Sequence, residues 1–158
     1  MLPLKKTNYL LRIFLHMLSA AAWATKCKIT KENDKLRVVF PAENMEVGDL
    51  VIYLESNFAT LYLGKYSHTH ASQTDFGPLS GKALKKNIAR LAFKKAIDFL
   101  NELTVVNAVF DSEGRLLTAG CSPIQFAYRN APSQLKKLEQ IFNQPLHVKE
   151  WIWSTELN

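Results

Sequence analysis

Residues 80–103 constrain the fold of this chain more than any other segment. At 100° per residue its apolar side chains gather on one half of a helical wheel, and only Leu91 departs from this pattern. The apolar half holds Ile88, Ala89, Ala92, Phe93, Ala96, Ile97, Phe99, Leu100 and Leu103. A helix of this kind lies at the surface and buries one side, so we expect it to pack on a sheet.

The remaining chain is rich in β-branched and aromatic runs separated by turn formers, which predicts strands. We expect strands at 24–30, 35–40, 49–54, 58–66, 104–110, 115–121 and 147–153, and a loop over 67–80. Two more helices are expected, at 1–24 and 131–142, the latter with Pro132 in its first turn. This order predicts a single α+β domain over 1–158. Its mainly antiparallel sheet has about five to seven strands, with helices mainly on one face.

Length and composition bound the class of protein. The chain has 158 residues, which suits one domain, and 47% of them are hydrophobic, which is enough for a core. Two cysteines do not make a disulfide scaffold. The net charge of +6 permits an anionic partner without requiring one.

The N-terminal segment has two interpretations. Lys5, Lys6 and Arg12 precede an apolar run that ends in Ala22-Trp23-Ala24, as in a cleaved signal peptide. Cleavage there would place the protein in the periplasm and let Cys27 pair with Cys121. The favoured interpretation is a retained first helix in a cytoplasmic protein, because His16 interrupts the run. The run is also too short for a membrane span, so we expect no membrane association.

The most pointed chemical feature is His68-Thr69-His70, since residues i and i+2 of a strand share a face. Two imidazoles could hold a metal if a third ligand joined them, and Asp75 is the nearest candidate. A metal-dependent enzyme centred on His68 and His70 is therefore one alternative. The other interpretation is that both histidines hydrogen-bond nearby polar loop residues, and this one needs no metal.

Basic residues crowd the start of the long helix, at Lys82, Lys85, Lys86 and Arg90. This order opposes the helix dipole, which favours acids at that end. A second alternative is therefore a nucleic-acid or phosphate-binding protein that uses these four bases. The simpler interpretation is a solvent-exposed helix face on which these charges lower the helix stability only slightly.

No catalytic motif supports an enzyme. The chain lacks G-x-S-x-G, and Gly77-Pro-Leu-Ser-Gly81-Lys82 has the wrong spacing for a phosphate-binding loop. We therefore expect no enzymatic activity and no cofactor.

The strand Leu36-Arg-Val-Val-Phe-Pro41, followed by 60–66 and His68-Thr69-His70, resembles small bacterial proteins of uncharacterised function. Those proteins carry a V-x-F-P strand and an H-T-H-F strand end, whereas here Ala71 replaces the final aromatic residue. Some of them look like immunity partners of secreted toxins. The resemblance implies a cytoplasmic protein with an interaction role.

These observations lead to one main hypothesis: a non-enzymatic bacterial protein-binding module, and more specifically an immunity protein that neutralises a toxin. The expected surface combines His68, His70 and Asp75 with the basic start of the helix at Lys82, Lys85, Lys86 and Arg90. Because this surface is basic, an acidic toxin domain is the expected partner.

Overall fold

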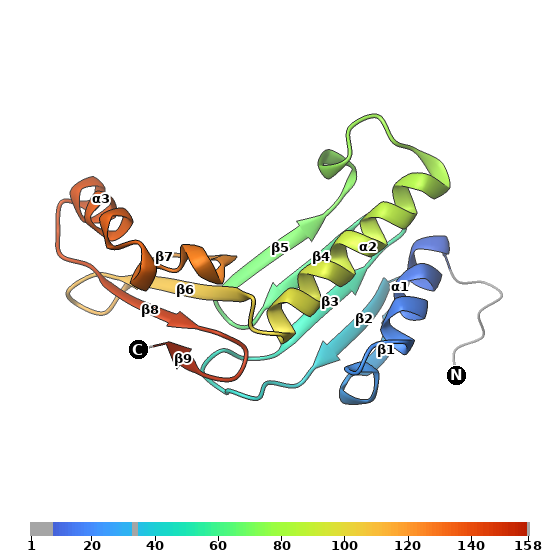
Figure 1. Ribbon diagram of the computed structural model, residues 1–158, viewed down its shortest axis with the longest axis horizontal. Coiled ribbons are helices and arrows are strands. Elements are labelled where there is room, and N and C mark those ends of the chain that lie inside the picture. Colours follow the sequence, from blue (N-terminus) through green and yellow to red (C-terminus); the bar gives the residue numbers. More distant parts are fainter. Residues whose placement is uncertain (1–7, 33–34, 158) are drawn as a thin grey trace. The chain divides into compact units, whose positions relative to one another are not determined.

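The computed structural model describes residues 8–32 and 35–157. Within these residues the chain forms three α-helices and two antiparallel sheets of five and four strands (Figure 1). It divides into two compact units. Unit 1 comprises residues 1–41, 49–62 and 69–97, and unit 2 comprises residues 42–48, 63–68 and 98–158. The α+β class is therefore confirmed.

Sheet A has its strands in sequence order. They are β1 (Lys28–Glu32), β2 (Lys35–Phe40), β3 (Leu50–Leu54), β4 (Ala59–Leu63) and β5 (Ser67–Ala71). Burial alternates along β3, where Leu50, Ile52 and Leu54 are completely buried and the residues between them are half-exposed. Such alternation is typical of a sheet with one covered face.

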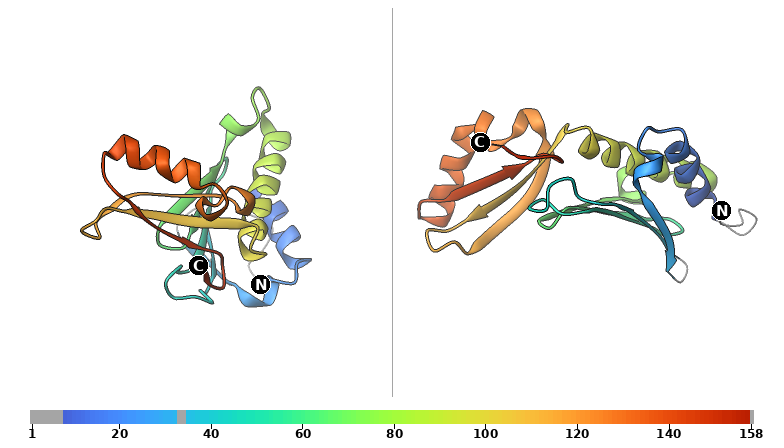
Figure 2. Two further views of the ribbon diagram at one scale, coloured as in Figure 1. Left: turned by 60° about the vertical axis from the view of Figure 1, so that its left-hand side comes forward. Right: turned by 90° about the horizontal axis from the view of Figure 1, so that it is seen from below.

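The covered face of sheet A is packed by helices. Both α1 (Tyr9–Ser19) and α2 (Gly81–Leu100) lie on the same side of the sheet (Figure 2). The side chain of Asn8 caps α1 by accepting a hydrogen bond from the Leu10 N–H at 3.0 Å. The ring of Phe14 meets that of Phe93 edge-on, with centroids 6.0 Å apart. The prediction that the long amphipathic helix packs on a sheet is confirmed.

Unit 2 is built on sheet B, whose strands have the order β7-β6-β8-β9. Their bounds are β6 (Thr104–Phe110), β7 (Leu116–Pro123), β8 (His147–Trp151) and β9 (Glu156–Leu157), and α3 covers Pro132–Phe142. Trp151 and Trp153 are both 2% exposed and form the centre of this core. Tyr66 stacks on Trp151 with ring centroids 4.9 Å apart.

Short 3-10 turns occur in both units, at Ala24–Lys26 and Gln73–Asp75 in unit 1 and at Ile124–Phe126 and Tyr128–Asn130 in unit 2.

Several predicted boundaries are wrong. The single sheet is two sheets, because β6 pairs with β7 on one side and with β8 on the other, and all three join sheet B. The strand expected at 58–66 breaks at Gly64, whose φ is +70°, and the chain then turns into β5. The loop expected over 67–80 therefore begins with a strand. Because Ser67–His70 are all polar, the sequence shows no alternation of apolar and polar residues there.

The first helix is shorter than expected. Of the predicted range 1–24, residues 1–7 lie outside the described residues, and α1 ends at Ser19. The strand expected at 24–30 begins only at Lys28, after the 3-10 turn. Leu10, Leu11, Phe14 and Leu18 are at most 8% exposed, so cleavage after Ala24 would remove four core side chains from unit 1.

Two further findings concern membrane-spanning helices and the cysteines. No helix in residues 8–32 and 35–157 is long and apolar enough to cross a membrane. Cys27 and Cys121 are both free thiols in the structure. Burial raises the pKa of the Cys27 thiol, whose Sγ lies 3.4 Å from the Ala24 carbonyl oxygen.

Candidate functional site

The face of sheet A opposite α1 and α2 carries a candidate site. Arg37 on β2 lies directly opposite Tyr53 on β3 in the strand register. Their neighbours Leu36, Val38, Ile52 and Leu54 are buried on the helix side. Since side chains alternate along a strand, Arg37 and Tyr53 emerge together on the other side.

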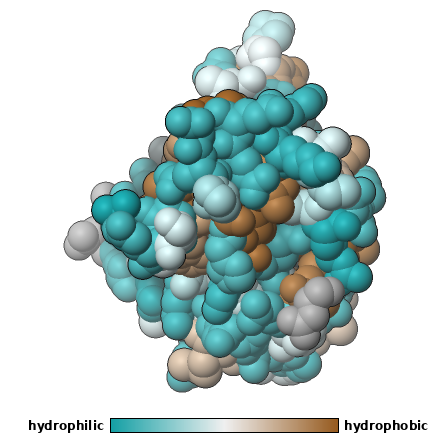
Figure 3. All heavy atoms as spheres, turned by 90° about the vertical axis from the view of Figure 1, so that its left-hand side faces the viewer, coloured by the Kyte–Doolittle hydropathy of each residue, from teal (hydrophilic) through white to brown (hydrophobic). Residues whose placement is uncertain are grey.

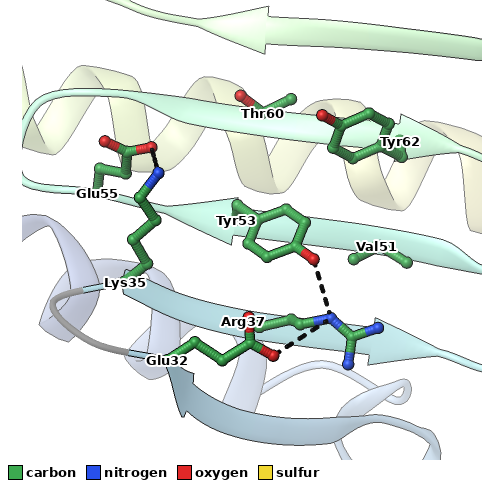
Figure 4. A pocket seen from close by; sticks show the side chains of 8 residues that line it. All are labelled: Glu32, Lys35, Arg37, Val51, Tyr53, Glu55, Thr60 and Tyr62. Carbon is green, nitrogen blue, oxygen red and sulfur yellow. Dashed lines mark hydrogen bonds and ion pairs between the residues drawn. The ribbon is translucent and has the colours of Figure 1, made fainter.

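On this uncovered face the side chains surround an open hollow of about 630 Å³ (Figure 4). We call it the sheet A hollow. It is lined by Glu32, Lys35, Arg37, Val51, Tyr53, Glu55, Thr60 and Tyr62, all of which belong to unit 1. They come from four sequence segments, so only the strand register assembles them.

Ion pairs and hydrogen bonds fix the charged side chains of the hollow. The Lys35 Nζ lies 2.8 Å from the Glu55 Oε1, and this contact raises the pKa of Lys35. The Arg37 Nε donates to the Tyr53 Oη at 3.2 Å and lies 3.9 Å from a Glu32 carboxylate oxygen (Figure 4). These exposed pairs contribute little to stability, but they orient the side chains that line the hollow.

Aromatic rings supply the apolar part of the hollow. Tyr53 and Tyr62 meet edge-on with centroids 6.0 Å apart, and the Arg37 guanidinium lies 6.0 Å from the Tyr53 ring centroid. Tyr62 is 45% exposed. Tyrosine and arginine are among the residue types that contribute most to protein–protein affinity.

The lining residues of the sheet A hollow are charged, hydroxyl-bearing or aromatic, apart from Val51. The lining includes no cysteine or histidine, and the Glu55 carboxylate is already paired with Lys35. What the hollow offers is two bases, two acids, hydroxyl groups and tyrosine rings. The sequence patterns did not predict this site. The alternation of Arg37, Tyr53 and Tyr62 with buried neighbours was the signal that could have revealed it.

The two histidines predicted as binding residues lie on β5, the strand next to β4 in sheet A. His68 and His70 are both exposed on β5 and share a side of the strand. The His70 Nδ1 lies 3.3 Å from the Thr60 Oγ1, so His70 contacts the rim of the hollow. Its ring also packs against Phe58, with centroids 5.1 Å apart.

Asp75 has a structural role in the turn after β5. Its Oδ2 accepts a hydrogen bond from the Ser72 backbone N–H at 2.8 Å, which closes a capping box around the 3-10 turn. Nowhere in the described part of the chain do three His, Cys, Asp or Glu residues gather in a way that could hold a metal ion. The metal hypothesis for His68 and His70 therefore has no third ligand among these residues.

The predicted helix bases lie away from the imidazoles. Lys82, Lys85, Lys86 and Arg90 belong to α2, which packs on the covered face of sheet A. On that side Lys95 ties α2 to β5, because its Nζ donates to the Thr69 Oγ1 at 3.0 Å and to the His70 carbonyl oxygen at 2.6 Å. The surface expected from sequence thus divides between the two sides of sheet A.

Buried polar groups in unit 2 are structural. The Glu150 carboxylate, 5% exposed, accepts hydrogen bonds from the backbone N–H groups of Tyr128 and Arg129 at 2.6 and 3.1 Å. Burial, and secondarily the Glu150 charge, raises the pKa of Tyr128. Exposed apolar side chains occur at Leu116 and Ile141. Apolar patches seen from the side of α3 are interrupted by hydrophilic residues (Figure 3).

Comparison of the chain with family models, with curated proteins and with solved structures finds no match.

Proposed function

We propose that this protein is a non-enzymatic binding module that recognises another protein through the uncovered face of sheet A. The observation that carries the proposal is the cluster of Arg37, Tyr53 and Tyr62 in the sheet A hollow. Their rings and guanidinium group are held by contacts within the sheet, so little side-chain freedom is lost on binding.

The charges of the hollow define the partner surface. Lys35 and Arg37 are balanced by Glu32 and Glu55, so the hollow itself does not select an acidic protein. A matching surface packs an apolar side chain against the Tyr53 and Tyr62 rings and offers both a carboxylate and a cation at the rim.

The resemblance to immunity-type proteins supplies a specific partner class. On this proposal the protein is bacterial and cytoplasmic, and its partner is a toxin domain encoded by the adjacent reading frame. The acidic partner expected from the sequence was inferred from the bases of α2, and the balanced charges of the hollow do not require it.

Isothermal titration calorimetry with that toxin domain tests the proposal. Tyr53→Ala and Tyr62→Ala should each weaken binding tenfold or more, because truncation of an interface hot spot, a class enriched in tyrosine, costs about 2 kcal/mol or more. The control is Lys136→Ala, since Lys136 is exposed on α3 in unit 2. Circular dichroism melts should show that the variants stay folded. Unchanged affinity in both tyrosine variants, or no binding to the toxin domain, would overturn the proposal.

A further inference from the structure

The exposed ridge of α2 is a second candidate surface on unit 1. After Ala83 in the sequence, the exposed side chains of α2 are Lys86, Arg90 and Lys94, and all three are basic. The helix holds six basic residues and one acidic residue, Asp98, near its C-terminal end. We define the basic ridge as Lys82, Lys85, Lys86 and Arg90.

The spacing of the ridge places like charges together. Lys82, Lys86 and Arg90 follow at intervals of four residues, and each interval is about 6 Å along a helix axis. Like charges at this spacing destabilise a helix, and bases near its N-terminus oppose the helix dipole. The sequence therefore keeps an arrangement that helix stability alone would disfavour.

Helix packing leaves the ridge available for a ligand. The apolar half of α2, including Ile88, Ala92 and Phe99, is buried. By contrast Lys82, Lys86 and Arg90 are exposed, and Lys85 is half-exposed. The Lys82 Nζ lies 5.9 Å from the Tyr9 ring centroid, so α1 borders the N-terminal end of the ridge.

The ridge lacks the features of a protein interface. Such interfaces have an apolar centre, yet the exposed positions beyond Ala83 are all basic and the nearby Phe93 is half-buried. None of the exposed side chains of α2 is an aromatic ring on which a nucleotide base could stack. What remains is a row of cations, which matches phosphate groups along a nucleic-acid backbone.

We infer that the basic ridge binds the phosphate backbone of a nucleic acid without sequence preference. The site lies on the helix side of sheet A, whereas the sheet A hollow opens on the other side of that sheet. The two sites therefore use different surfaces of unit 1, and this inference does not depend on the proposed function.

A salt titration with fluorescein-labelled 20-nucleotide poly-U RNA tests the inference. With four phosphate contacts, the logarithm of the association constant should fall with the logarithm of the salt concentration with a slope of about −3. This slope corresponds to roughly a 50-fold loss of affinity between about 50 and 200 mM salt. Lys86→Gln/Arg90→Gln should reduce the slope by about half.

The matched control is Lys136→Gln/Lys137→Gln, which removes the same two charges from exposed positions of α3. This control should keep the wild-type slope. The inference is overturned by no RNA binding at about 50 mM salt. An equal reduction of the salt slope in the control also overturns the inference, because the net charge of the protein would then explain the binding. If polyglutamate displaces the labelled RNA as strongly as unlabelled poly-U does, the inference is overturned in favour of an acidic protein as the ligand.

Discussion

At the scale of single residues, Gly64 has the least room for a side chain among the glycines of unit 2. Its φ is +70°, and a Cβ added there would lie 2.1 Å from the Val47 carbonyl oxygen. The adjacent Lys65 N–H donates to that same oxygen at 2.7 Å. The turn between β4 and β5 thus depends on a close backbone approach that only glycine allows.

Gly64→Ala should therefore lower the free energy of unfolding by at least about 3 kcal/mol, from the strained φ and the displaced backbone. Gly114→Ala is the matched control, because its φ is +79° but an added Cβ would have no neighbour within 4 Å. It should cost only about 1 kcal/mol. Urea denaturation of both variants provides the measurement, and equal losses would contradict this account of Gly64.

Asp111 predicts an acid-dependent loss of stability. Its carboxylate accepts hydrogen bonds from the Arg115 and Glu113 backbone N–H groups and from the Arg115 Nε, which holds its pKa below the ordinary 3.8. The unfolded chain binds this proton at higher pH than the folded chain does. The stabilisation is therefore present above pH 3.8 and is lost as the pH falls through the lowered pKa.

Asp111→Asn removes that titration. The melting temperature of the wild type should fall further than that of Asp111→Asn when the pH is lowered below 3.8. Melting curves across this range measure the difference. Parallel pH profiles for the two proteins would show that Asp111 does not contribute.

At the scale of elements, α2 combines a well-packed apolar side with an unfavourable charged side. Lys86→Gln removes two like-charge pairs, with Lys82 and with Arg90, so it should stabilise the protein by a total of about 0.4–1 kcal/mol at low salt. The gain should disappear near 1 M salt, where charges are screened over about 3 Å. Thermal melts at both salt concentrations measure it. A lower melting temperature at low salt would contradict the argument that the ridge opposes helix stability.

The elements also show what the sequence could predict. Strands β2 and β6 were predicted to the residue, because their β-branched runs are bounded by turn formers or by Pro41. The amphipathic pattern likewise predicted α2. Strand β5 was missed because its residues are polar, and its role as a strand depends on pairing within sheet A.

The candidate site was harder to predict than the elements. The sheet A hollow takes Arg37, Tyr53 and Tyr62 from three strands, and no short sequence window contains all of them. Only the strand register places them on one face. His70, which the sequence predicts as a binding residue, contacts Thr60 at the rim of the hollow. The sequence-based prediction also grouped His70 with the helix bases, which belong to the other side of sheet A.

At the scale of the whole molecule, neither unit is a continuous stretch of sequence. Strands β4 and β5 and helix α2 each contribute residues to both units. Unfolding one unit therefore disrupts elements that the other unit needs. We expect a single cooperative thermal transition by calorimetry, with equal calorimetric and van't Hoff enthalpies. Two resolved transitions would contradict this coupling.

An NMR titration of the methyl-labelled protein with the toxin domain from the adjacent reading frame tests the central claim most directly. The methyl groups of Val51 and Thr60 line the sheet A hollow, whereas those of Leu138 lie on α3 in unit 2. Our account predicts that the largest shifts on binding occur at Val51 and Thr60 and that Leu138 stays unchanged. A bound partner that leaves Val51 and Thr60 unshifted would contradict it.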